Sequence, residues 1–186
     1  MPRIAKFTRS VMADKLSEVF KGFGYEGASL SLLAEAVELS KASLYHHFPG
    51  GKEDIAAHVL AHSGAKLQRL VLGPLSGKGA GDARVKASLE GTAKYYDGAV
   101  PICLMNSLLL GEGRSLFGAR IKGAVDAWAK GLGAAAADSG FSSADAESWA
   151  IEAIERIQGS LILCRVQGSR KPLEACLKLL AEDLTD

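Results

Sequence analysis

The chain has little of several features that mark particular classes of protein. Its 186 residues include three cysteines and five prolines, 6% are aromatic, and the net charge is +1 at pH 7. Because an odd set of three does not suggest a disulfide framework, we expect Cys103, Cys164 and Cys176 to be reduced thiols in a helical core. No apolar run approaches the roughly 20 residues that span a bilayer, and no apolar segment follows the basic start as in a secretory signal. We therefore expect a cytoplasmic protein.

Charge is nearly balanced overall but unevenly distributed. Arg3, Lys6 and Arg9 precede the first carboxylate, Asp14, and residues 40–52 contain two lysines, two histidines and no acid. A nearly neutral protein with an acid-free face can still bind phosphates, because the local field matters more there than the net charge. Hydrophobic residues make up 48% of the chain and charged residues 23%, which predicts a folded core rather than disorder.

Apolar residues recur with helical spacing, and no segment shows the period-two alternation of a strand. In the first helix, for example, Met12, Leu16, Phe20 and Phe23 form one stripe. Helices are predicted at about 8–23, 30–37, 41–48, 52–72, 82–96, 102–110, 116–137, 144–166 and 172–184, with a flexible linker at 73–82. The predicted fold class is all-α, with a three-helix helix-turn-helix domain at 1–51 and a larger helical domain at 52–186.

Residues 30–52, LSLLAEAVELSKASLYHHFPGGK, have the pattern of two short helices around a tight turn. Ser40 is a suitable N-cap for the second helix, and the Pro-Gly-Gly at 49–51 ends it. The arrangement is typical of a helix-turn-helix whose second helix enters the major groove of DNA. A three-helix bundle used for protein contact, with the Tyr-His-His cluster serving in packing, is the alternative.

The second helix of this motif has two different faces. Leu44 and Phe48, four residues apart, are expected to face the core. Ala42, Ser43 and His46 then project from the opposite side. A small side chain lets a helix approach the base edges closely, and a hydroxyl can donate or accept a hydrogen bond there. The outward face is therefore the predicted reading surface.

The segment from Thr8 to Leu60 resembles the DNA-binding domain of the tetracycline-repressor (TetR) family. The matching positions are Gly24-Tyr25, Ser29, Leu33-Ala34, Leu39-Ser40-Lys41, Leu44-Tyr45, His47-Phe48 and Lys52-Glu53-Asp54-Ile55. The resemblance implies that Lys41, Tyr45, His47 and Lys52 contact DNA, where such side chains hold phosphates and fix the register. The full predicted DNA-binding set is Ser31, Ser40, Lys41, Ala42, Ser43, Tyr45, His46, His47 and Lys52.

The sequence departs from the family pattern in two places. Glu38 stands in the turn where the family usually has glycine, so a positive φ there would cost about 1 kcal/mol or more. Its carboxylate also lies near the expected DNA side. The Pro-Gly-Gly-Lys stop is one residue longer than usual, which would let Lys52 reach a different phosphate.

The last two predicted helices are unusually apolar for the end of a small protein. Residues 144–166 are apolar over a wide arc, and residues 172–184 add further leucines. Two such helices predict a homodimer with a two-fold, four-helix interface. Simple core packing within one chain is the other interpretation.

Residues 103–114 resemble the LmrA/YxaF-like branch of the family, which implies a drug-like or flavonoid effector. The segment is apolar with one amide, Asn106, and aromatic residues elsewhere could supply flat walls. The predicted ligand-binding residues are Met105, Asn106, Leu109, Phe117 and Trp128.

The sequence gives little support for a catalytic or a metal-binding site. His58 and His62 have the i, i+4 spacing of a shared metal, but no H-E-x-x-H motif or neighbouring ligand completes a site. No G-x-S-x-G elbow or P-loop is present. We predict no enzyme, cofactor, metal or membrane partner, but a homodimeric repressor that binds a palindromic DNA operator and is released by an aromatic or apolar effector. A helical enzyme or a protein-interaction module with a small-molecule pocket is the alternative.

Overall fold

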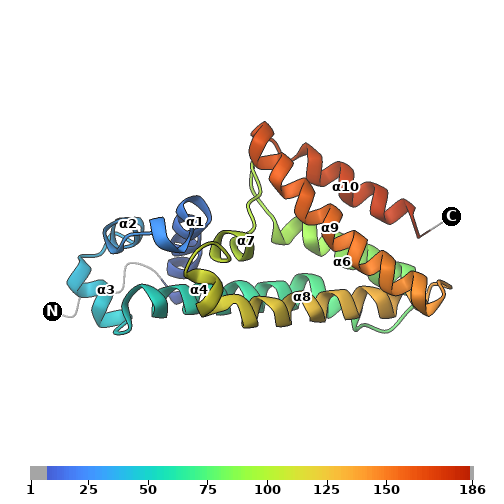
Figure 1. The fold of residues 1–186 in the computed structure, drawn as a ribbon, viewed down its shortest axis with the longest axis horizontal. Helices are drawn as coiled ribbons and strands as arrows, with labels where there is room; N and C mark the ends of the chain where they lie inside the picture. Colours follow the sequence, from blue (N-terminus) through green and yellow to red (C-terminus); the bar gives the residue numbers. More distant parts are fainter. Residues whose placement is uncertain (1–7, 185–186) are drawn as a thin grey trace. The chain divides into compact units, whose positions relative to one another are not determined.

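The computed structural model describes residues 8–184, and this part of the chain is helical with no strand (Figure 1). The elements in chain order are α1 (Arg9–Gly27), α2 (Leu30–Ala36), α3 (Lys41–His47), α4 (Gly51–Leu67), the π-helix η1 (Gln68–Leu72), α5 (Gly73–Leu75), α6 (Gly81–Tyr95), α7 (Leu104–Leu108), α8 (Gly113–Ala137), α9 (Ser143–Gln167) and α10 (Lys171–Glu182). The all-α prediction is confirmed. Arg3 and Lys6 lie outside the described residues.

The chain packs as two compact units. The first contains the chain up to residue 64 together with residues 104–121, and the second contains residues 65–103 and 122 onwards. Residues 104–121 thus belong to the same unit as the helix-turn-helix, and α7 packs on α1, although about forty residues of the second unit precede them in the sequence. The domain boundary predicted between residues 51 and 52 divides the chain by function rather than by packing, so it stays a prediction.

Hydroxyl caps begin the first three helices, α1, α2 and α3. Thr8 Oγ1, Ser29 Oγ and Ser40 Oγ accept hydrogen bonds from backbone N–H groups three residues later, which satisfies donors that a helix start leaves open. In α2 the N-cap residue is Ser29. These bonds fix where each helix of the motif starts and therefore which side chains α3 turns outward.

The end of α1 differs from the prediction. The helix continues to Gly27 through a kink at Gly24, whose φ is +68°. Phe23, expected in the core stripe, is 58% exposed, so that assignment was wrong. Because the kink redirects the backbone, Tyr25 is the aromatic residue that is buried there.

The second unit holds a helix that runs through the predicted linker. Gly73 and Pro74 do not end it; α4 continues through η1 and α5 to Leu75, so the linker prediction holds only for the following short loop. The π-turn places the Leu70 carbonyl against Gly91 of α6, where a Cβ would overlap it, and Ser88 Oγ donates to Val71 O at 2.9 Å. Close packing of α6 therefore depends on small residues.

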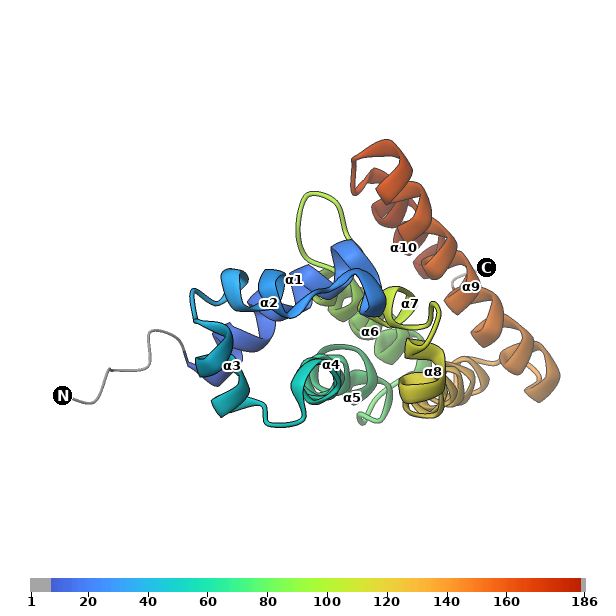
Figure 2. The same cartoon turned by 60° about the vertical axis from the view of Figure 1, so that its left-hand side comes forward.

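The C-terminal helices were predicted nearly to the residue. Ser142 caps α9 through its hydroxyl, and a proline stands in the first turn of α10. The two helices pack side by side in both views (Figures 1 and 2). In contrast, α7 spans only Leu104–Leu108, shorter than the predicted 102–110. None of the three cysteines forms a disulfide; Cys103 and Cys164 are buried, but Cys176 is half-buried rather than in the core.

Candidate nucleic-acid interface

The α3 helix is held from behind by two apolar side chains. Leu44 is 1% exposed and Phe48 8% exposed, and the Phe48 ring lies 5.3 Å from that of His58 on α4. Ala42 and His46 are exposed on the other side, as the helical wheel predicts. The helix therefore presents one polar and small-residue face to solvent while the other face is fixed in the core.

The predicted DNA-binding residues do not share one environment. The exposed ones are Ser31, Ser40, Lys41, Ala42, Tyr45, His46 and His47. Ser43 is half-buried, and its hydroxyl lies 2.9 Å from Ser40 Oγ in the cap. Lys52 is also half-buried. No acidic residue interrupts the sequence between Ser40 and Lys52, so the outward face of α3 carries no carboxylate of its own.

The turn before α3 contains the strained residue that the sequence indicated. Glu38 has φ of +54°, and it is the non-glycine residue of the described chain with positive φ. Its amide donates to Glu35 O at 2.9 Å, and that of Leu39 donates to Ala34 O at 2.9 Å. The turn thus adopts a positive φ that suits glycine, while carrying a side chain that disfavours it.

Tyr45 connects α3 with the start of α4. A Cβ on Gly51 would lie 3.5 Å from the Tyr45 ring, so the ring rests against the backbone where α4 begins. Gly51 has φ of +65°, which glycine adopts without strain. Glu53 and Asp54 follow in the first turn of α4, so carboxylates complement the helix dipole there.

Lys52 contacts two groups of α1 that sequence reasoning did not identify. Its ammonium lies 4.4 Å from the centroid of the Tyr25 ring and donates to Glu26 O at 3.4 Å. Tyr25 was noted in the sequence only as part of the Gly-Tyr motif, and Glu26 was not singled out. Nothing in the spacing of these residues could have indicated the contact, because it depends on the kink at Gly24.

The end of α1 is also fastened to residues 107–113. Glu26 Oε1 accepts a hydrogen bond from Glu112 N at 3.0 Å, and Ser107 Oγ donates to Lys21 O at 3.1 Å. A Cβ on Gly111 would overlap the Glu26 carboxylate. Segments far apart in sequence are therefore joined at α1.

The predicted ligand-binding residues fall in both packing units. Met105, Asn106, Leu109 and Phe117 belong to the first unit and Trp128 to the second. Met105, Phe117 and Trp128 are buried, whereas Asn106 and Leu109 are half-buried. Among the described residues, no acceptor lies within hydrogen-bonding distance of the buried Nε1 of Trp128. The ligand assignments stay predictions.

The second unit contains a buried polar cluster around Tyr96. Its hydroxyl donates to Cys103 Sγ at 3.6 Å and accepts a hydrogen bond from Gln158 Nε2 at 3.2 Å. Burial raises the pKa of Tyr96 well above its ordinary value, and Cys103 and Tyr95 add to the shift. The phenol is therefore neutral and binds its neighbours as a hydroxyl.

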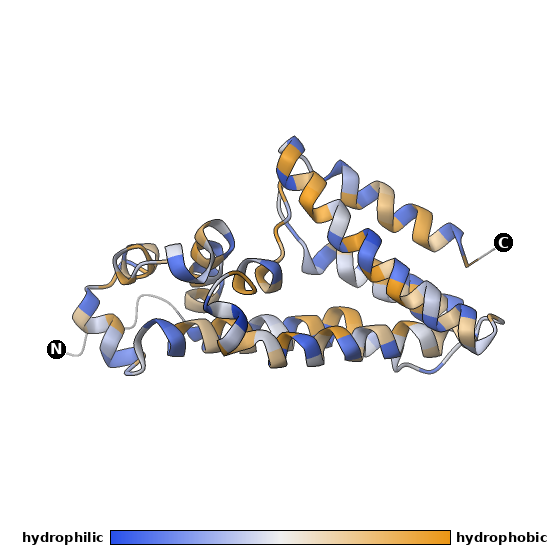
Figure 3. Ribbon diagram, viewed as in Figure 1, coloured by the Kyte–Doolittle hydropathy of each residue, from blue (hydrophilic) through white to orange (hydrophobic). Residues whose placement is uncertain are grey.

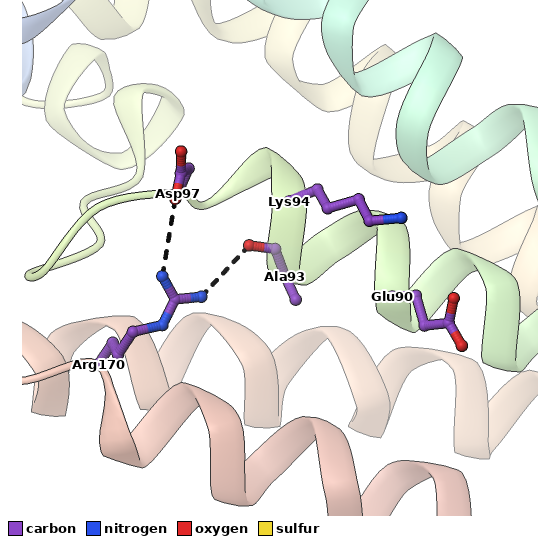
Figure 4. Close-up of a pocket in the computed structure, with 5 residues that line it drawn as sticks. All are labelled: Glu90, Ala93, Lys94, Asp97 and Arg170. Atoms are coloured by element: carbon purple, nitrogen blue, oxygen red, sulfur yellow. Dashed lines mark hydrogen bonds and ion pairs between the residues drawn. The ribbon is translucent and has the colours of Figure 1, made fainter.

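An open pocket of about 480 Å³ lies beside the end of α6 (Figure 4). Its lining residues are Glu90, Ala93, Lys94, Asp97 and Arg170. The Arg170 guanidinium donates to Ala93 O at 3.4 Å and to Gly98 O at 3.1 Å, and lies 3.8 Å from Asp97 Oδ1. Arg170 thus caps a carbonyl in the last turn of α6 and one in the loop that follows it.

Neither histidine of α4 belongs to a metal site in the described residues. His62 Nε2 lies 3.1 Å from Asp14 Oδ1, and His58 packs on Phe48. No group of three or more metal-ligating side chains is found among residues 8–184. None of the helices in the described part of the chain combines the length and apolarity of a transmembrane span.

Comparison with known sequences matches both halves of the chain. Residues 14–59 match the profile described as "Bacterial regulatory proteins, tetR family". Residues 85–179, about half of the chain, match the profile "Transcriptional regulator LmrA/YxaF-like, C-terminal domain".

Individual relatives agree with these profiles. The HTH-type transcriptional regulator YxaF of Bacillus subtilis (strain 168), itself described as uncharacterized, is 24% identical over 105 residues, which cover 54% of this chain and 55% of that relative. A TetR regulator from Legionella pneumophila superposes with a TM-score of 0.78 at 18% identity, covering 98% of this chain and 99% of that one. A cysteine mutant of the TetR regulator CifR, in complex with a 26-base-pair operator, superposes with a TM-score of 0.76 at 24% identity, covering 98% of each chain.

Proposed function

We propose, since this chain belongs to the TetR family of bacterial transcriptional regulators and has an LmrA/YxaF-like C-terminal domain, that it is a homodimeric repressor which binds a palindromic DNA operator and is released by a small effector. The observation that carries the proposal is the exposed, acid-free face of α3, whose other side is anchored by the buried Leu44 and Phe48. Because the members of this family are regulators, we propose no catalytic role.

On this account the α3 face divides into two kinds of contact. Ala42, Ser43 and His46 read base edges in the major groove, with the Ala42 methyl group suited to a thymine methyl. Lys41, Tyr45, His47 and Lys52 hold phosphates and fix the register, together with the exposed hydroxyls of Ser31 and Ser40. CifR, which has the same fold, is bound to operator DNA in its own structure, and this supports DNA as the partner.

A two-fold dimer is supported by an apolar face on the last two helices. Ile151, Ile162 and Val166 lie on one side of α9 and are at least half exposed, with Val166 at 77%. Gly159 lies on the same side with open space where a Cβ would be, which permits close approach of another helix. Leu179 of α10 is also exposed (Figure 3 shows the apolar residues along both helices). Such a patch is typical of a subunit interface.

The proposed effector is aromatic or apolar and carries a hydrogen-bond acceptor. The buried Trp128 Nε1 lacks an acceptor among the described residues, and an unsatisfied buried donor costs about 1–3 kcal/mol. A carbonyl or ether oxygen of an effector would recover that energy. Met105, Asn106, Leu109 and Phe117 are kept as further proposed contacts. Release follows if the effector binds the conformation with low operator affinity more tightly.

The proposal is tested by anisotropy titration of a fluorescent duplex from the region upstream of the gene, with and without an uncharged aromatic compound such as flavone. We expect salt-dependent binding, with half-sites about 34–36 Å apart on the duplex, and a loss of affinity when an effector is added. Lys41→Ala should weaken binding to all sequences and lower the salt slope by about one. A change of base preference alone in this variant would contradict the assigned role of Lys41.

A further inference from the structure

One buried aromatic ring contacts both an α8 residue and the first turn of α4. The Tyr25 ring stacks on Phe20, with centroids 6.4 Å apart and planes at 9°. The edge-to-face contact with Phe117 has centroids 5.5 Å apart and planes at 71°. The Lys52 ammonium lies 4.4 Å from the centroid of the same ring. Tyr25 therefore joins a residue proposed for effector binding to a residue proposed for phosphate binding, within one packing unit.

The contact between Lys52 and Tyr25 has the character of a cation–π interaction. Burial raises the pKa of the Tyr25 hydroxyl, and the carboxylates of Glu112 and Glu53 raise it further, so the ring is neutral. A neutral ring attracts an ammonium group through its quadrupole. Lys52 Nζ also donates to Glu26 O, so two neighbouring groups of α1 restrain a side chain that would otherwise have many rotamers.

The backbone around Tyr25 cannot move independently of residues 107–112. On one side of Tyr25, Lys21 O accepts a hydrogen bond from Ser107 Oγ, and on the other side Glu26 Oε1 accepts one from Glu112 N. The kink at Gly24 lies between these two bonds, where a Cβ would lie 3.3 Å from Ser107 O. A displacement of this segment or of Phe117 would therefore be transmitted to the Tyr25 ring.

We propose that Tyr25 is a positioning residue that orients Lys52 for a DNA phosphate and makes this orientation depend on Phe117. The inference rests on the proposed DNA-binding function and adds to it a residue that touches no DNA. Because the Tyr25 ring already orders the Lys52 side chain, less conformational entropy is lost when Lys52 binds a phosphate. Any change at Phe117 then alters phosphate affinity through Lys52.

The test uses the full chain and a labelled duplex of arbitrary sequence, titrated over a series of KCl concentrations. Lys52→Ala and Tyr25→Leu should each weaken binding by about three- to tenfold and lower the salt slope. Tyr25→Phe keeps the aromatic ring, so this variant should bind DNA within about twofold of the wild-type affinity. In the Lys52→Ala background, Tyr25→Leu should have no further effect, because both changes remove the same contact.

Met12→Ala is the matched control for a loss of core packing, since Met12 is buried in the same helix α1. It should lower the melting temperature and leave the salt slope of DNA binding unchanged. If Tyr25→Leu does not fold, Phe117→Leu takes its place in the same cycle with Lys52→Ala. Its effect on binding should likewise vanish when Lys52 is absent.

The outcomes separate the inference from the proposed function. A Tyr25→Leu protein that binds with the wild-type affinity and salt slope, or whose defect is equally large in the Lys52→Ala background, would overturn the role of Tyr25 and leave DNA binding standing. A folded wild-type protein that binds no duplex even at low salt would overturn the proposed function itself.

Discussion

At the residue scale, the turn at Glu38 carries strain that one substitution should relieve. Its φ of +54° costs an L-residue about 1–2 kcal/mol, whereas glycine adopts it freely. Glu38→Gly should therefore raise the free energy of unfolding by about 1 kcal/mol in urea denaturation. Glu35→Gly, on the exposed side of α2, should instead lower it by about 1 kcal/mol. Equal effects of the two changes would mean that the backbone at position 38 is not strained.

The buried phenol of Tyr96 should make stability depend on alkaline pH. Its pKa is raised in the folded protein, so its contribution is complete below the ordinary pKa of about 10 and is lost as the pH rises toward the folded value. We expect the urea midpoint to fall above pH 10. Tyr96→Phe should lower stability at neutral pH, because it removes two hydrogen bonds, yet flatten this alkaline decline. An unchanged decline would contradict the assignment to Tyr96.

At the scale of elements, the sequence predicted helices best where local chemistry decides. The serine caps of α3 and α9 and the proline at the start of α10 are local signals, and the structure confirms them. Gly73-Pro74 is also a local signal, but the π-turn carries the helix past it because packing against α6 overrides propensity. The contact of Tyr25 with Phe117 could not be predicted, since it joins residues more than eighty positions apart. Of the α3 residues assigned to the site, Ser43 is half-buried and the others are exposed, and their roles await the binding experiments.

Two glycines in helices should respond to alanine in opposite ways. A Cβ on Gly91 would overlap the Leu70 carbonyl, so Gly91→Ala should cost about 3 kcal/mol or more by forcing α6 away from η1. Gly64 in α4 has nothing within 4 Å of the same position, so Gly64→Ala should stabilise by up to about 1 kcal/mol. Thermal unfolding followed by circular dichroism would measure both. A tolerated Gly91→Ala would mean that the π-turn does not set this packing.

At the scale of the whole molecule, activity is proposed to require two copies. Ile162→Glu places a charge in the apolar face of α9 and should convert the dimer to monomers in sedimentation velocity experiments. Binding to a palindromic operator should fall by more than about tenfold, because each monomer reaches only one half-site. Val100→Glu, at an exposed apolar residue outside α9 and α10, is the control and should stay dimeric. A monomeric wild-type protein that binds its operator tightly would refute the interface.

The central claim is that the outward face of α3 binds DNA, and Ala42→Glu tests it most directly. Ala42 is exposed, so the substitution should leave the melting temperature nearly unchanged while placing a carboxylate in an acid-free face. Ala127→Glu on the exposed side of α8 is the matched control. In an anisotropy titration with the upstream duplex at low salt, we predict that Ala42→Glu weakens binding by more than about a hundredfold and that Ala127→Glu binds like the wild type. Tight, wild-type binding by a folded Ala42→Glu protein would contradict the account.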